Sequence, residues 1–165
     1  MKSQVGTLVF FSGKMGAGKT TYSKLVTKEL NAILLSEDEW LASLYPQKIL
    51  SLQDYVYYSN LLKPQMKKLV QSILLSGKDV VMDFPANTPN QRAWFNEIFS
   101  EVHASHRLIF IDVANEVCLE RIEKRRHEQP ERAATDTVEM FEKMTAYFSP
   151  PSREEGFNIE RVPSL

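Results

Sequence analysis

Short apolar runs alternate with segments of helical spacing along this chain. Residues 7–12 (TLVFFS) form an apolar run that ends at a glycine, which predicts a strand buried on both faces. Residues 20–30 predict a helix, and residues 32–35 predict a second strand. Ser36 is followed three residues later by Glu39, which is the pattern of a capping box and predicts that a short helix begins there.

The middle of the chain continues the alternation of predicted strands and helices. Residues 54–76 have helical spacing, with a kink or a boundary expected at Pro64. Residues 80–83 predict a third strand, residues 89–102 a helix, and residues 107–112 a fourth strand. The apolar stripe of the long helical segment consists of Leu61, Leu62, Met66, Leu69, Ile73 and Leu74.

The last third adds two helices and one strand. Residues 115–126 predict a charged amphipathic helix, and residues 137–148 resume helical spacing. Residues 127–135 have no apolar period and contain a proline, so we expect a mobile connector there. Residues 157–162 alternate like an edge strand. Strands separated by helices predict an α/β fold, a three-layer sandwich with a mainly parallel five-stranded sheet, in one domain over residues 1–165.

Composition narrows the class of protein. The 165 residues are 43% hydrophobic and 25% charged, with a net charge of −1, so one packed core is attainable and a nucleic acid is an unlikely main partner. Cys118 is the lone cysteine, which points to a reducing compartment. We find no secretion signal or membrane-spanning run. We therefore expect a cytoplasmic protein without a membrane partner, a monomer or weak homodimer.

The most informative motif is GKMGAGKT at residues 13–20, which matches the phosphate-binding P-loop directly after a strand and before a helix. Its glycines let backbone N–H groups converge on phosphate oxygens at the positive end of the helix. Lys19 is expected to reach the β- and γ-phosphates, and the Thr20 hydroxyl to coordinate Mg²⁺. The predicted nucleotide-binding residues are Gly13, Lys14, Met15, Gly16, Ala17, Gly18, Lys19, Thr20 and Thr21.

The spacing of the glycines also bears on which nucleotide binds. A dinucleotide is disfavoured because the G-x-G-x-x-G spacing is absent. A structural turn with an exposed lysine is the alternative interpretation of the loop. The chain has no guanine-specific N-K-x-D motif, so we expect ATP rather than GTP.

Ligands of parallel sheets bind at the carboxyl ends of the strands, where Asp38 and Asp83 are predicted to lie. Asp38 is the best candidate for the base that accepts a proton from an acceptor hydroxyl. Alternatively, Asp38 favours a helix N-terminus through the helix dipole, which is the interpretation that we prefer for Glu37 and Glu39.

Asp83 ends an apolar strand, as in a Walker B motif, and is a candidate to hold Mg²⁺. Its alternative role is to form a turn before Phe84 and Pro85. No second acid follows it, which disfavours a motor-type ATPase. In the next loop and helix, Asn87 and Arg92 are weaker candidates for substrate contact, and Arg92 is equally consistent with a solvated helix charge.

Arg121 and Arg125 are four residues apart and share one helix face, where they could neutralise phosphate charge during transfer. The alternative is a solvated face with local ion pairs, and Arg132 is a weaker candidate. Aromatic residues gather within residues 40–58, either to line an acceptor pocket or to fill the core under a helical cap.

Five segments together carry a resemblance to a known group: GKMGAGKT, SEDEW, VVMDFPANTPNQR, FIDVANEVCLERIEKRR and FSPPSREEGFNI. Over residues 7–162 the chain resembles small P-loop kinase-like proteins known as AAA-type ATP-binding proteins, which are similar to zeta-toxin and chloramphenicol-phosphotransferase-type kinases. The resemblance implies a nucleoside-monophosphate-kinase-like core that uses ATP with Mg²⁺. It also implies that Asp38 is the base, that Arg121 and Arg125 contact phosphates, and that residues 127–135 form a short lid.

These observations predict an ATP-dependent phosphotransferase that acts on a hydroxyl of a small molecule. A polynucleotide 5′-hydroxyl kinase is an alternative, which the lack of a basic stripe disfavours. A nucleotide-dependent switch or binding module is an alternative from another class, in which ATP binding controls a partner.

Overall fold

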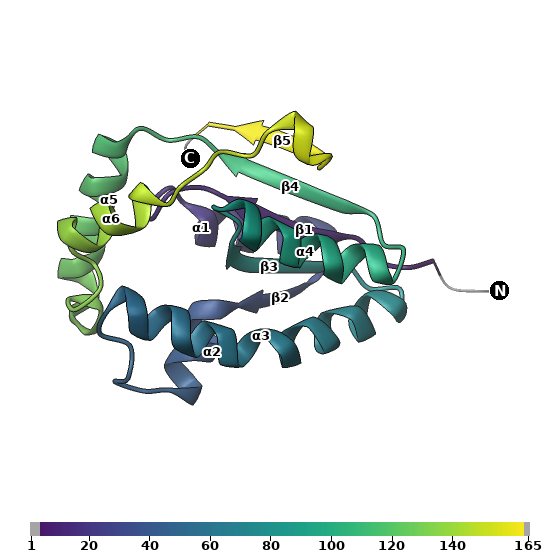
Figure 1. Cartoon of the computed structure of the whole chain (residues 1–165), viewed down its shortest axis with the longest axis horizontal. Coiled ribbons are helices and arrows are strands. Elements are labelled where there is room, and N and C mark those ends of the chain that lie inside the picture. Colours follow the sequence, from purple (N-terminus) through teal and green to yellow (C-terminus); the bar gives the residue numbers. More distant parts are fainter. Residues whose placement is uncertain (1–3, 164–165) are drawn as a thin grey trace.

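The computed structural model describes residues 4–163 (Figure 1). The strands are β1 (Leu8–Ser12), β2 (Ile33–Ser36), β3 (Val80–Pro85), β4 (His106–Ile111) and β5 (Ile159–Val162). The helices are α1 (Lys19–Leu30), α2 (Glu37–Leu44), α3 (Leu52–Leu75), α4 (Pro89–Glu101), α5 (Asn115–Glu128) and α6 (Val138–Ala146), with short 3₁₀ turns η1 (Pro130–Arg132) and η2 (Arg153–Glu155).

The strands form one five-stranded sheet in the order β2-β3-β1-β4-β5, and every neighbouring pair is parallel. This confirms the predicted fold class. Ser36 at the end of β2 is in register with Asp83 in β3, so the acids that follow β2 begin at the same sheet edge as Asp83. The P-loop leaves β1 at that edge as well, because β1 ends at Ser12.

Alternate residues of the central strands supply two cores, one on each face of the sheet. Leu8 and Phe10 point to the side covered by α3 and α4, where Phe10 stacks on Phe95 with ring centroids 4.4 Å apart. Val9 and Phe11 point to the opposite side and belong to a cluster that includes Cys118 of α5. The three layers follow directly from this alternation (Figure 1).

The boundary expected as one alternative at Pro64 is wrong, and so is the predicted capping box. Pro64 lies inside α3, which is one helix from Leu52 to Leu75. Met66 and Leu74 are buried after the proline, as Leu62 is before it, so packing against the core holds one helix together across it. The predicted capping box is absent: Ser36 is the N-cap of α2, but its side chain makes no capping hydrogen bond. The predicted apolar stripe of α3 is correct at Leu62, Met66 and Leu74, which are buried. Leu61 and Leu69 of the same stripe are exposed.

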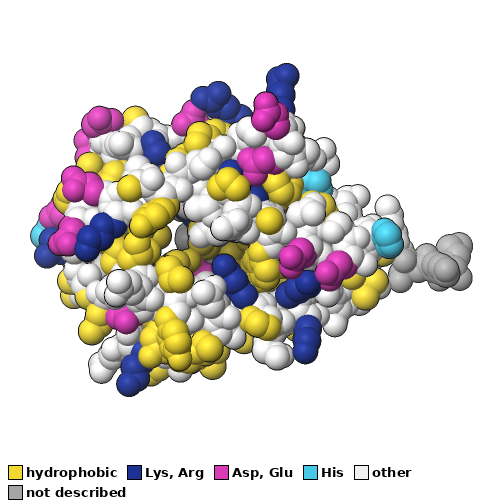
Figure 2. All heavy atoms as spheres, viewed as in Figure 1, with side chains coloured by type: hydrophobic (Ala, Val, Ile, Leu, Met, Phe, Trp, Pro, Cys, Tyr) yellow, Lys and Arg dark blue, Asp and Glu magenta, His cyan; other side chains and the backbone are white. Residues whose placement is uncertain are grey.

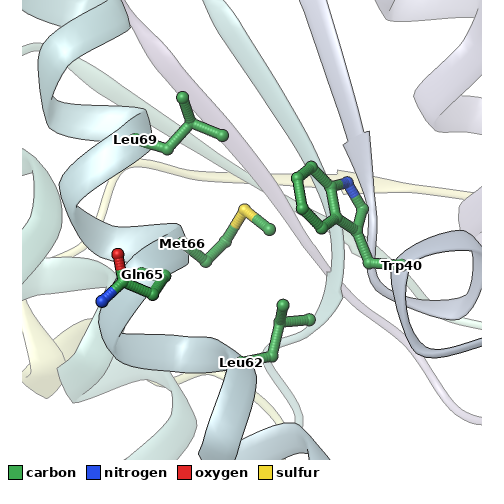
Figure 3. A pocket seen from close by; sticks show the side chains of 5 residues that line it. All are labelled: Trp40, Leu62, Gln65, Met66 and Leu69. Atoms are coloured by element: carbon green, nitrogen blue, oxygen red, sulfur yellow. The ribbon is translucent and has the colours of Figure 1, made fainter. Parts of the chain in front are cut away.

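The helix α2 faces the middle of α3 across a shallow groove of about 210 Å³. Figure 3 shows Trp40 of α2 directed toward Met66, Leu62 and Leu69 of α3. Trp40 therefore belongs to the contact between these two helices. Within residues 4–163, no helix has the length and apolarity that a membrane span requires.

Candidate active site

The P-loop connects β1 to α1 through two glycines in the left-handed region. Gly16 has φ 81° and Gly18, the N-cap of α1, has φ 108°. At Gly16 there is also no space for a side chain, because a Cβ would lie 2.7 Å from the carbonyl oxygen of Cys118. The loop is therefore packed directly on α5. Gly16 is required by both conformation and space, and Gly18 by conformation.

Lys19 folds back over the loop that precedes it. Its Nζ donates a short hydrogen bond to the carbonyl of Gly13 and lies 3.4 Å from the carbonyl oxygen of Lys14. Burial lowers the pKa of Lys19, while the nearby carboxylates of Asp83 and Asp38 act in the opposite direction. Lys19 thus lies within electrostatic range of both acids that the sequence singled out.

Thr20 and Asp83 are in direct contact. The Thr20 hydroxyl donates a hydrogen bond to Asp83 Oδ2 at 2.8 Å. Burial raises the pKa of Asp83, and the hydrogen bond from Thr20 partly offsets that effect. The described residues contain no group of three or more His, Cys, Asp or Glu that could form a metal cage. A hydroxyl beside one carboxylate is instead suited to Mg²⁺, which keeps several waters and binds substrate phosphates.

Asp38 lies at the start of α2 with a side chain that is 62% exposed. Its carboxylate oxygen Oδ2 lies 3.7 Å from Nη2 of Arg132, in the turn η1. Arg132 also donates through Nε to Asp136 at 2.9 Å. The segment predicted as a mobile connector therefore contains a 3₁₀ turn, whose Arg132 lies beside the candidate base.

Arg121 and Arg125 both extend from α5 toward the P-loop region. Arg121 donates to the carbonyl oxygen of Ala17 at 2.9 Å and lies beside Gly18. Arg125 is close enough to Lys19 to act on its pKa, and its guanidinium pairs with the buried carboxylate of Asp136. The structure places Arg121 in contact with the loop and Arg125 within electrostatic range of Lys19, and contact of either arginine with phosphates stays a prediction.

A cavity of about 620 Å³ opens beside the P-loop. Its wall includes Lys14 and Met15 of the loop, the first turns of α3, residues 85–91 and the end of α6. Figure 2 shows hydrophobic side chains around a hollow on this face of the molecule. The predicted aromatic cluster divides: Tyr55 and Tyr57 line the cavity, whereas Tyr45 packs against Tyr58 with ring centroids 4.5 Å apart.

Asn87 joins the cavity wall to the P-loop. Its Oδ1 accepts a hydrogen bond from the backbone N–H of Gly13 at 2.9 Å. Arg92 of α4 connects the segment after β3 with the segment after α6: it is fully buried, donates to the carbonyls of Ala86 and Ser149, and pairs with Glu155 at 2.7 Å. Arg92 is thus not solvated, so its interpretation as a solvated helix charge is wrong. It does not line the cavity, and its contact with a substrate stays a prediction.

Glu37 is a buried carboxylate that sequence reasoning assigned to the helix dipole alone. It accepts hydrogen bonds from Tyr55 and, at 2.8 Å, from Ser59, both on α3. Burial raises its pKa to about 7. Tyr55 lines the cavity, and burial together with the nearby Glu37 carboxylate raises the pKa of its hydroxyl. The one sequence signal for the burial of Glu37 is its position directly after the apolar run that forms β2.

A P-loop at the carboxyl edge of a parallel three-layer sheet is the architecture of P-loop nucleotide-binding proteins. A family model described as the AAA domain matches residues 8–151, and the chain belongs to that family. No curated protein matches the sequence.

Solved structures share the fold at low identity. A protein of Chloroflexus aurantiacus J-10-fl described as a proposed kinase is 19% identical, with a TM-score of 0.76 over 97% of this chain and 86% of that one. The Mycobacterium tuberculosis APS kinase CysC, bound to AMPPNP and APS, is 18% identical, with a TM-score of 0.65 over 97% and 89%. A gluconokinase of Sinorhizobium meliloti 1021 is 14% identical, with a TM-score of 0.61 over 100% and 85%.

Proposed function

We propose that the protein is an ATP-dependent phosphotransferase that moves the γ-phosphoryl group of ATP to a hydroxyl of a small molecule. The backbone of residues 13–20 binds the phosphates, with Lys19 reaching the β- and γ-phosphates. Thr20 and Asp83 are the residues that fit Mg²⁺. When bound there, Mg²⁺ would neutralise charge on the phosphate oxygens during transfer.

In the proposed step the acceptor oxygen forms a bond to the γ-phosphorus as the bond from that phosphorus to the bridging oxygen breaks. The acceptor proton passes to the Asp38 carboxylate, and ADP leaves. Asp38 suits this role because it is exposed and lies within electrostatic range of Lys19 and Asp83. Arg121 and Arg125 supply positive charge on the α5 side of the loop.

The observation that carries this proposal is the shared wall between the P-loop and the cavity. Lys14 and Met15 belong to the phosphate-binding loop and also line the 620 Å³ space. A molecule in the cavity would therefore lie against the loop that holds the phosphates. The volume is in the range of small-molecule sites, which favours a small acceptor over a protein or a nucleic acid strand.

The test is transfer of labelled phosphate from ATP with Mg²⁺ to a panel of nucleosides, sugars, aromatic alcohols, aminoglycosides and 5′-hydroxyl oligonucleotides. Lys19→Ala serves as the blank. We expect a phosphorylated small molecule that forms only with the wild-type lysine. Phosphorylation of oligonucleotides alone would favour the polynucleotide kinase. Tight ATP binding with no product from any acceptor would favour a nucleotide-dependent switch.

A further inference from the structure

The cavity beside the P-loop has almost no charge in its wall. Among its lining residues, all of which are described, Lys14 is the one charged side chain, and Asp, Glu, Arg and His are absent. The Lys14 ammonium is also already engaged: it donates to Asn115 Oδ1 at 2.8 Å and lies 5.6 Å from the centroid of the Phe148 ring. The wall therefore offers little to pair with an ionised ligand.

The buried cation Arg92 does not supply the missing charge, because it does not line the cavity. Its Nε pairs with Glu155 and its Nη1 donates to the carbonyls of Ala86 and Ser149, while its Nη2 is buried without a hydrogen-bond partner among the described residues. An anionic group that entered the cavity would lose water without gaining a matched countercharge. That loss is costly, because a buried ion needs a partner.

The polar groups of the wall are uncharged and lie next to the P-loop. Asn87 contacts Gly13, and Gln91 accepts a hydrogen bond from the Asn87 backbone N–H at 2.8 Å. Within the described part of the chain, the amide nitrogens of both side chains have no hydrogen-bond partner. They remain able to donate to a hydroxyl or carbonyl oxygen of a ligand.

The rest of the wall is apolar and aromatic. Tyr55 and Phe148 lie in it, and Val56, Tyr57 and Tyr147 are 48%, 61% and 69% exposed. Exposed rings and a branched aliphatic side chain at a cavity favour a ligand with a flat apolar body.

We infer that the acceptor is an uncharged alcohol with a flat, largely apolar body, whose hydroxyl end lies beside Asn87 and the P-loop. This inference rests on the proposed function, in which the cavity holds the acceptor. Phosphorylated, sulfated and carboxylated hydroxyl compounds are excluded as good acceptors. Aliphatic polyols are poor acceptors too, because they leave the aromatic wall without contact.

Binding tests the inference without requiring catalysis. 2-Naphthalenemethanol and 2-naphthoate have the same ring system and differ in charge, and the fluorescence of each reports binding. We expect the wild-type protein to bind the alcohol at least tenfold more tightly than the carboxylate. Equal or tighter binding of the carboxylate would overturn the inference, and so would failure of both probes to bind at millimolar concentration.

A matched pair of variants locates the site. Val56 and Leu61 are both on α3 and are 48% and 49% exposed, but only Val56 lines the cavity. Val56→Arg should strengthen binding of 2-naphthoate several-fold, because it adds the missing cation. Leu61→Arg should leave binding of both probes unchanged. Equal effects of the two substitutions would place the probe outside the cavity and contradict the inference.

Transfer assays separate this inference from the proposed function. Neutral aromatic alcohols that bind in the cavity but never receive phosphate from ATP would refute the phosphotransferase and leave the inference on cavity chemistry standing. Lys19-dependent phosphorylation of a carboxylated sugar such as gluconate, without transfer to neutral aromatic alcohols, would support the phosphotransferase and refute the inference.

Discussion

Arg125 and Asp136 form a two-point ion pair, in which Arg125 Nε lies 2.7 Å from Asp136 Oδ2 and Arg125 NH2 lies 2.7 Å from Asp136 Oδ1. The carboxylate is fully buried and also accepts from Arg132, which in turn reaches Asp38. The end of α5, the turn η1 and the start of α2 are therefore linked through one buried acid. This link places the guanidinium of Arg132 beside the candidate base, Asp38.

Asp136→Asn should destabilise the protein by roughly 2–3 kcal/mol, because a neutral amide would replace the buried carboxylate that pairs with Arg125 and Arg132. Chemical denaturation measures this change. The control is Glu139→Gln, which removes an exposed pair with Lys143 and should leave the stability close to that of wild type. Equal losses of unfolding free energy in the two variants would contradict a larger contribution from the buried carboxylate.

Asp83→Asn should remove most of the benefit that Mg²⁺ gives to ATP binding. Asp83 accepts the hydrogen bond of Thr20, and changing such a supporting ligand typically lowers metal affinity by roughly tenfold to a hundredfold. ATP affinity is measured with and without Mg²⁺. Asp112→Asn is the matched control, because Asp112 follows another strand but pairs with Arg161. A Mg²⁺ effect lost in Asp112→Asn and kept in Asp83→Asn would contradict the assignment.

Gly16→Ala should abolish ATP binding, whereas Gly156→Ala should not. The two glycines have nearly the same φ, 81° and 83°, so both substitutions cost about 1–2 kcal/mol of backbone strain. Only at Gly16 would the new Cβ meet backbone, 2.7 Å from the oxygen of Cys118, and nothing lies within 4 Å at Gly156. Thermal unfolding and ATP titration of both variants check this. Intact ATP binding by a folded Gly16→Ala variant would refute it.

Glu37→Gln should change how stability depends on pH. The pKa of Glu37 is about 7 in the folded protein and 4.5 ordinarily, so the folded state holds the extra proton between these values. Its contribution to stability is full below pH 4.5 and falls as pH rises through 7. The glutamine stays neutral, so the variant should gain up to about 3 kcal/mol relative to wild type between pH 5 and pH 8.

Urea unfolding at these two pH values measures the effect of Glu37→Gln. The control is Glu39→Gln, which changes an exposed carboxylate two residues further along α2. It should leave the pH dependence as in wild type. Identical pH slopes for wild type and Glu37→Gln would contradict the assigned pKa.

Local patterns in the sequence were sufficient for the strands and for the P-loop. The buried run before Gly13 and the glycine spacing after it depend on neighbours in the chain, and both agree with the structure. The parallel sheet followed from the alternation of strands and helices. Its strand order and the register that pairs Ser36 with Asp83 are set by packing between distant elements, which the pattern alone does not encode.

The errors at Arg92 and Glu37 share one physical cause, which is burial by residues far along the chain. Arg92 resembles a solvated helix charge until Glu155, 63 residues later, pairs with it in the interior. Glu37 is an ordinary first-turn acid until Tyr55 and Ser59 enclose it. Asp136 gave no local signal, because its two arginine partners are set by the way the chain turns after α5.

The most direct measurement is phosphate transfer from ATP with Mg²⁺ to a neutral aromatic alcohol by Asp38→Asn and Glu39→Gln, beside their ATP affinities. Asp38 and Glu39 are adjacent exposed acids in the first turn of α2, and only Asp38 is 3.7 Å from Arg132. We expect both variants to bind ATP like wild type. The transfer rate of Asp38→Asn should fall at least about a hundredfold, which is within the range of general-base catalysis. The transfer rate of Glu39→Gln should equal that of wild type. Transfer by Asp38→Asn at the wild-type rate would contradict it.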